Sequence, residues 1–79
     1  MPTIFREKGY RFSFYSYDLG EPMHVHVTKS GAEAKVWMNP LALAWAKEFR
    51  EHEIREFLEL VAENRAVIES AWNERRGNQ

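Results

Sequence analysis

The chain has 79 residues, 44% of them hydrophobic, and a formal net charge of −1. A chain of this length supports one hydrophobic core and no second one, so we expect a single domain over residues 1–79. Cysteine is absent, which excludes a disulfide scaffold and a cysteine-ligated metal site.

The first residues, MPTIFREKGY, bring charges early and contain no apolar run, unlike a signal peptide. No stretch approaches the roughly 18 apolar residues that a membrane-spanning helix needs. We therefore expect a cytoplasmic protein that does not engage a membrane. Residues 1–47 carry six Lys or Arg against four Asp or Glu, whereas residues 48–79 carry five against eight. The N-terminal half is thus the better suited to meet an anion.

The N-terminal half predicts an antiparallel sheet, because aromatic and β-branched residues alternate with polar ones and turn residues separate the runs. The predicted strands cover residues 3–6, 10–17, 23–28 and 32–38. The predicted turns and loops lie at Lys8-Gly9, residues 18–22, Ser30-Gly31 and Asn39-Pro40.

Residues 41–46 are ambiguous between helix and strand. Their alanines favour a helix, whereas Leu41, Leu43 and Trp45 alternate as they would in a strand. We favour a fifth strand or extended segment here.

The C-terminal part predicts an amphipathic helix over residues 51–75. Apolar residues recur there at helical spacing, at Ile54, Phe57, Leu58, Val61, Ile68 and Trp72. Asn64 and Arg65 interrupt this stripe, and one straight helix would be about 37 Å long, which is long for so small a sheet. The predicted fold is therefore α+β: an antiparallel sheet of four to five strands (residues 3–46) packed on a C-terminal amphipathic helix or bent helix pair (residues 51–75).

Two histidines, His24 and His26, are the sharpest candidate functional residues. In a strand, residues two apart point to the same side, which places the imidazoles about 7 Å apart. Such a pair can serve as general acid and base near neutral pH, or supply two ligands to a metal ion. No third ligand is obvious, although Glu33 is a candidate, and we expect no cofactor. The alternative is that both are ordinary exposed strand residues.

If neighbouring strands pair, Arg11, Tyr15, Lys35 and Trp37 share the face that bears the histidines. Cations and stacking rings beside two imidazoles suit an RNA phosphate and base. The alternative is that Tyr15 and Trp37 only pack across the strands. Arg65 either contacts this site or extends along an apolar surface with its charged end in solvent.

Three segments, GYRFSFYSYDLGEPMHVHV, AKVWMNPLALA and ELVAENRAVIESAW, resemble a family of short prokaryotic domains of unknown function. The resemblance covers nearly the whole chain. It implies a small antitoxin-like partner protein encoded nearby, in a type II toxin–antitoxin module. The residues that match the family pattern are Tyr10, Arg11, His24, His26, Lys35, Trp37, Asn64, Arg65 and Trp72. The chain departs from that pattern at Met23, where a second proline is usual, and at Arg50, where a capping serine is expected.

The leading hypothesis is a toxin-like component that acts on RNA in the manner of a ribonuclease. In it His24 and His26 are the catalytic acid and base, and Arg11, Tyr15, Lys35, Trp37 and Arg65 bind the substrate. Two alternatives remain open: a non-catalytic protein–protein interaction module that uses the sheet edge or the helix, and a metal-binding domain built on the histidines. A homodimer is a further possible assembly. Replacing both histidines with alanine is expected to abolish activity and leave the fold intact.

Overall fold

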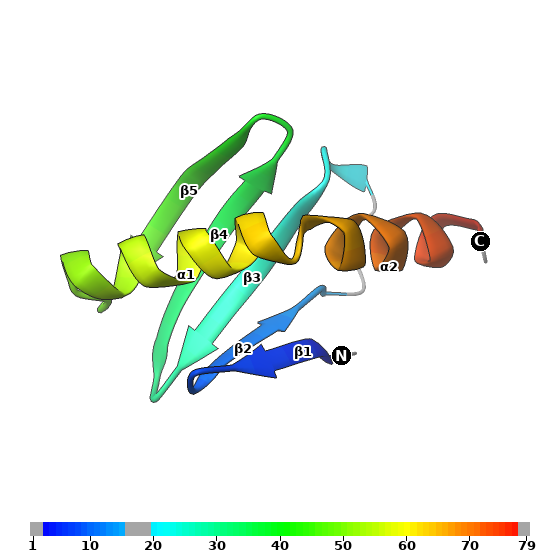
Figure 1. The fold of residues 1–79 in the computed structure, drawn as a ribbon. Coiled ribbons are helices and arrows are strands. Elements are labelled where there is room, and N and C mark those ends of the chain that lie inside the picture. Colours follow the sequence, from blue (N-terminus) through cyan, green and yellow to red (C-terminus); the bar gives the residue numbers. More distant parts are fainter. Residues whose placement is uncertain (1–2, 16–19, 78–79) are drawn as a thin grey trace.

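The computed structural model describes residues 3–15 and 20–77. In that part of the chain, five strands precede two helices: β1 (Thr3–Glu7), β2 (Tyr10–Ser13), β3 (His24–Lys29), β4 (Ala32–Met38), β5 (Leu41–Lys47), α1 (Glu51–Glu63) and α2 (Arg65–Gly77). The strands form one sheet in the order β1-β2-β3-β4-β5, and every neighbouring pair is antiparallel (Figure 1). The predicted α+β class is confirmed, and residues 41–46 belong to a strand.

Two of the hairpins close with two-residue turns at the predicted positions. Lys8 and Gly9 have φ of 54° and 85°, and Ser30 and Gly31 have φ of 49° and 87°. Positive φ at both central residues is the backbone that matches the twist of paired strands, and glycine adopts it without strain. Asn39-Pro40 forms the turn between β4 and β5.

The second strand is shorter than predicted. It ends at Ser13, so Phe14 and Tyr15 lie outside the strand. The rest of the predicted strand to Tyr17, and residues 18 and 19 of the predicted loop, lie outside the described residues.

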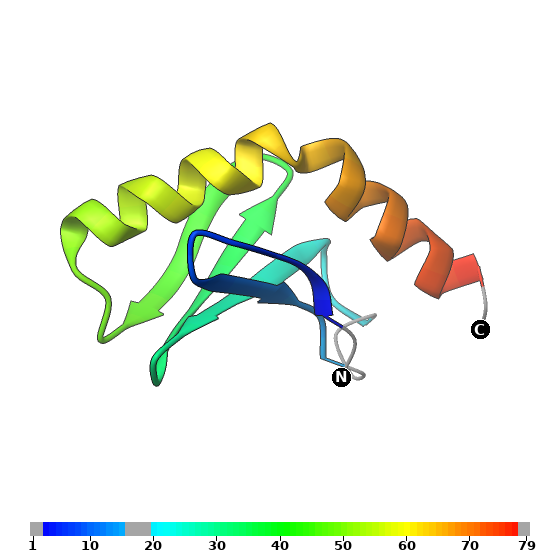
Figure 2. The same ribbon diagram turned by 60° about the horizontal axis from the view of Figure 1, so that its bottom comes forward.

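The helical segment bends at Asn64 (Figure 2), so of the two arrangements that the sequence left open the structure has the bent helix pair. The Asn64 backbone N–H donates to the Leu60 carbonyl at 3.0 Å, and the Asn64 side-chain Nδ2 donates to the same oxygen at 2.8 Å. The Leu60 carbonyl at the end of α1 therefore accepts from both the backbone and the side chain of Asn64. At the start of α1, Glu53 Oε1 accepts from the Arg50 N–H at 2.9 Å. In a capping box, the glutamate side chain accepts from the backbone N–H of the N-cap residue. Glu53 makes this bond although the N-cap residue, Arg50, is not the expected serine.

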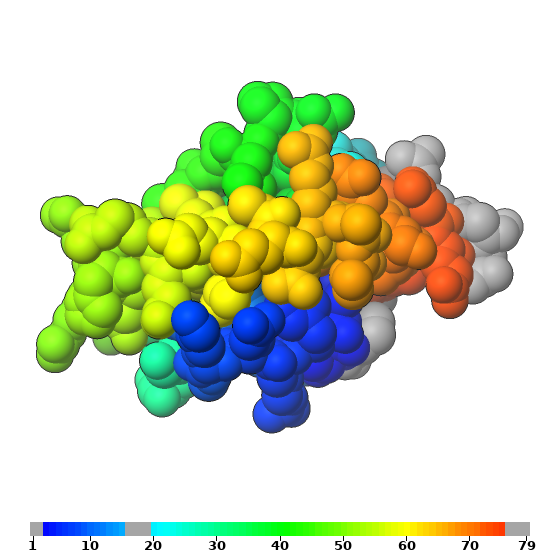
Figure 3. Space-filling view, in the orientation of Figure 1, coloured from blue at the N-terminus to red at the C-terminus, as the bar shows by residue number. Residues whose placement is uncertain are grey.

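Both helices lie on one side of the sheet (Figures 1 and 2), and helical side chains run across the front of the molecule in Figure 3. The core lies between these layers. Its buried side chains are Tyr10, Phe12, Phe14, Val25, Val27, Ala34, Val36 and Met38 from the sheet and its connections, and Phe57, Leu60, Val61, Ile68 and Trp72 from the helices. The Tyr10 hydroxyl reaches across to α1 and donates to Glu56 Oε1 at 2.8 Å. Burial, with the Glu56 carboxylate beside it, raises the pKa of Tyr10 well above its usual value.

Candidate functional site

The sheet face turned away from the helices carries the predicted site residues. Val25 and Val27 pack in the core, so His24 and His26, which alternate with them, point to the opposite side. The register pairs His24 with Trp37 and His26 with Lys35. Directly opposite residues share a face. We call this surface the histidine face; of the predicted site residues it carries Arg11, Tyr15, His24, His26, Lys35 and Trp37.

His24 is fully buried, with 0% of its surface exposed. Its ring centroid lies 5.6 Å from that of Trp37 and 5.4 Å from that of Trp72. The second contact arises because α2 extends past the end of the sheet (Figure 1). His24 Nδ1 lies 2.8 Å from the Pro22 carbonyl oxygen. Since a carbonyl only accepts, this geometry assigns the proton to Nδ1.

His26 is 5% exposed and lies beneath Tyr15. The two ring centroids are 4.0 Å apart, and the Tyr15 hydroxyl donates a short hydrogen bond to Glu33 Oε2. The same carboxylate oxygen lies 3.7 Å from His26 Nδ1. The centroids of the two histidine rings are 5.2 Å apart. The alternative that both histidines are ordinary exposed strand residues is therefore wrong: packing against aromatic rings covers each of them.

The predicted cations are placed differently from one another. Lys35 Nζ lies 2.6 Å from Glu21 Oε1 and 4.5 Å from the centroid of the Trp37 ring. Arg65 lies in α2, on the other side of the sheet, where its Nε donates to Glu69 Oε2 at 2.8 Å. The fold therefore brings Lys35 to the histidines and does not bring Arg65 to them.

Trp45 also lies on the histidine face, although its sequence pattern did not predict this. A strand with regular alternation would place Trp45 on the same side as Leu43. In the sheet, however, Val36 pairs with Leu43 and Lys35 pairs with Trp45, so Ala44 is an extra, bulged residue. The bulge turns Leu43 towards the helix side and Trp45 towards the histidine face. Trp45 is 42% exposed, and its ring centroid lies 6.4 Å from that of His26.

The chemistry available at this face follows from its packing. Neither imidazole presents its ring to solvent, so a dissolved substrate reaches them only if Tyr15 or the tryptophans move. Within residues 3–15 and 20–77, no three His, Asp or Glu side chains gather as metal ligands. In the same part of the chain, no helix has the length and apolarity to cross a membrane.

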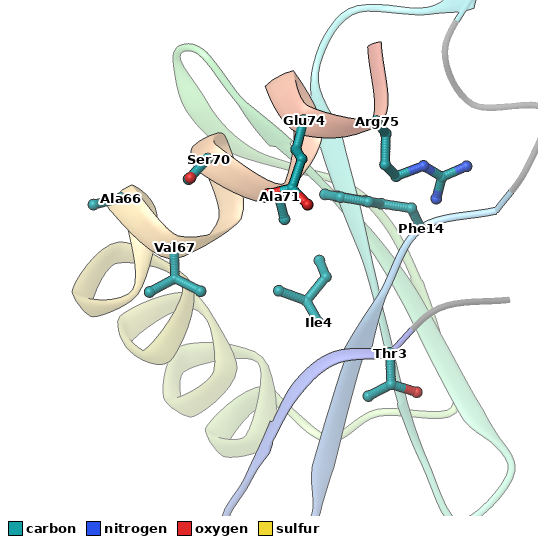
Figure 4. A pocket seen from close by; sticks show the side chains of 9 residues that line it. All are labelled: Thr3, Ile4, Phe14, Ala66, Val67, Ser70, Ala71, Glu74 and Arg75. Atoms are coloured by element: carbon teal, nitrogen blue, oxygen red, sulfur yellow. The ribbon is translucent and has the colours of Figure 1, made fainter. Parts of the chain in front are cut away.

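One hollow, of about 220 Å³, adjoins the histidine face and is lined by Pro22, Met23, Trp37, Asn39, Pro40 and Ala42. Another, of about 600 Å³, lies between α2 and β1 (Figure 4). Ile4, Phe14 and Val67 line it, and Arg75 at its rim lies over the Phe14 ring. Neither hollow has a local signal in the sequence, because each joins residues far apart in the chain.

These features define a class: a small α+β domain with an open antiparallel sheet, two helices on one face and a packed histidine pair on the other. The family model of a domain of unknown function, DUF4160, matches residues 9–73, and the chain belongs to this family. The predicted resemblance to a family of unknown function is thereby confirmed. No curated protein and no solved structure matches the chain.

Proposed function

We propose that the chain is a protein-binding module that takes up an extended segment of a partner along β5. The supporting observation is the exposed apolar character of this edge strand. β5 has the sequence LALAWAK, in which Lys47 is the only charged residue, and no described strand pairs with its outer side. Leu43 and Trp45 are 36% and 42% exposed.

Edge strands that are not used for binding usually carry charges or are covered. The other edge of this sheet follows that rule more closely, because β1 contains Arg6 and Glu7. Each edge strand contacts one helix, β1 with α2 and β5 with α1. β5 adds to this only the bulge at Ala44 and the terminal Lys47. A partner strand would pair the outward N–H and C=O groups of β5 and cover Leu43 on one face and Trp45 on the other.

The apolar hollow beside the start of β5 adds side-chain recognition to this main-chain pairing. Trp37 and Pro40 line it, and Ala42 connects it to β5. Its volume of about 220 Å³ suits one large apolar side chain of the partner. The inferred partner is therefore a small protein with an apolar extended segment. The resemblance to a two-gene module suggests the product of an adjacent gene.

Trp45→Lys is expected to weaken this complex about 30-fold or more, since a half-exposed tryptophan is a typical hot-spot residue and a lysine opposes strand addition. The fold should persist, with a change in unfolding free energy below about 1 kcal/mol. Co-purification and calorimetry with the adjacent gene product measure the first effect, and urea unfolding measures the second.

Val67→Lys is the matched control, because Val67 is 49% exposed and lies on α2, away from β5. It should leave binding unchanged. Loss of binding in Val67→Lys with retention in Trp45→Lys would move the interface to α2. Sedimentation of the purified chain alone tests the remaining possibility, a homodimer that Trp45→Lys would also dissociate.

A second candidate function, a toxin-like component of a type II toxin–antitoxin module that acts on RNA, has support from one observation. The register gathers Arg11, Lys35 and both histidines on a single face. Cations beside imidazoles suit phosphate chemistry.

Inducible expression in a bacterium tests this function. If it holds, the wild type arrests growth and fragments RNA, and Arg11→Gln combined with Lys35→Gln relieves both effects. Arg65→Gln, on the far side of the sheet, should remain toxic. Normal growth with intact RNA in all three strains would exclude the RNA-directed function.

A further inference from the structure

Two arginines lie side by side on β1 and β2. Arg6 and Arg11 are directly opposite in the antiparallel register, an arrangement that places their Cβ atoms about 5 Å apart on one face. Like charges at such positions destabilise a sheet unless a counter-charge is present. Thr28 continues the same row on β3 as the partner of Arg11.

The described part of the chain supplies neither arginine with an acidic partner. Glu7 follows Arg6 but pairs with Tyr10 on the helix side, where it accepts from Asn64 Nδ2 at 3.5 Å. Arg11 Nε donates to Thr3 Oγ1 at 2.7 Å, which fixes its guanidinium and leaves its terminal nitrogens available.

A hollow of about 340 Å³ adjoins this pair, between the turns of the β1–β2 and β3–β4 hairpins. Its lining includes Arg6, Arg11, Thr28, Lys29 and Ser30. Lys29 Nζ lies 4.5 Å from the centroid of the Tyr10 ring, on the helix side of the sheet, so Arg6 and Arg11 supply the positive charge that faces the hollow. Glu33 also borders the hollow, and its carboxylate accepts from the Tyr15 hydroxyl, on the side of His26.

We propose that this hollow binds a phosphate group, held by the guanidinium N–H groups of Arg6 and Arg11 and by the Thr28 hydroxyl. Guanidinium groups present paired donors that match phosphate oxygens. A bound dianion also removes the repulsion between the arginines. The site is independent of the proposed binding along β5, which lies at the opposite edge of the sheet.

The test compares melting temperatures in sodium phosphate and in sodium chloride at equal pH and ionic strength. In chloride, Arg6→Gln is expected to raise the melting temperature by roughly 1 to 5 °C, because it removes a like-charge pair. In phosphate the wild type should gain this stability from the anion, and the advantage of Arg6→Gln should disappear. Titration calorimetry with inorganic phosphate should show about a tenfold or greater loss of affinity in Arg11→Gln.

Arg55→Gln provides the control, because Arg55 is an exposed arginine that already pairs with Glu51 in α1. Phosphate also stabilises proteins by exclusion from their surface, and Arg55→Gln should respond to it as the wild type does. An equal phosphate response in wild type, Arg6→Gln and Arg55→Gln would overturn the proposal. A second experiment compares the binding of uridine 5′-monophosphate with that of uridine. Binding of the nucleotide but not the nucleoside supports a phosphate site, whereas equal binding of both contradicts it.

Discussion

Trp72→Ala is expected to lower the free energy of unfolding by about 3–5 kcal/mol, the usual cost of removing a large buried aromatic side chain. Trp72 is 2% exposed. Its ring centroid lies 5.2 Å from that of Phe14, edge to face, and 5.4 Å from that of His24. A domain of this size is stable by only roughly 4–12 kcal/mol, so the loss is a large part of the total. Urea unfolding followed by circular dichroism measures it.

The reason for so large an effect is the position of Trp72 at the end of the sheet. α2 extends past the strands there (Figure 1), and Trp72 links it both to the core and to the histidine face. Val67→Ala, an exposed change in the same helix, should alter the unfolding free energy by less than about 0.5 kcal/mol. A loss below about 1 kcal/mol in Trp72→Ala would show that α2 is not held against the sheet in solution.

Local patterns in the sequence were sufficient for most of the fold. Lys8-Gly9 and Ser30-Gly31 predicted two turns because glycine and positive φ go together there. Asn64 marked the place where a bend was one of two alternatives, because it interrupts an otherwise continuous apolar stripe, and its side chain donates to the Leu60 carbonyl at the end of α1. Alternation along the strands likewise placed His24 and His26 on the same face as Lys35 and Trp37.

Features that depend on distant residues were not predictable in this way. The burial of His24 requires Trp72, which lies 48 positions further along the sequence. The residue pattern of the β3 segment alone could not predict that contact. The cover over His26 requires Tyr15 to lie beyond the end of β2 and to be tethered to Glu33 on β4. The bulge at Ala44 depends on its pairing with β4, whereas residues 41–46 by themselves show an uninterrupted alternation. These three contacts decide what the candidate site exposes.

The burial of the histidines also changes what is expected of their alanine variants. His24→Ala should lower the unfolding free energy by about 2–4 kcal/mol, because it opens a cavity between two tryptophans and removes the donor to the Pro22 carbonyl. His52→Ala is the matched control: His52 is exposed in the first turn of α1, and its loss should cost less than about 0.5 kcal/mol. Chemical denaturation of the two variants provides the comparison, and equal stabilities would contradict the packed environment of His24.

His24→Asn separates a structural role of this histidine from a chemical one. The asparagine Nδ2 occupies nearly the position of the imidazole Nδ1 and can keep donating to the Pro22 carbonyl, so less stability should be lost than in His24→Ala. Asparagine does not titrate near neutral pH, however, and it removes any acid–base function. If His24 only packs the sheet, binding and growth phenotypes should follow stability, with His24→Asn lying between the wild type and His24→Ala. If the histidine exchanges protons with a substrate, His24→Asn should be as inactive as His24→Ala while remaining folded.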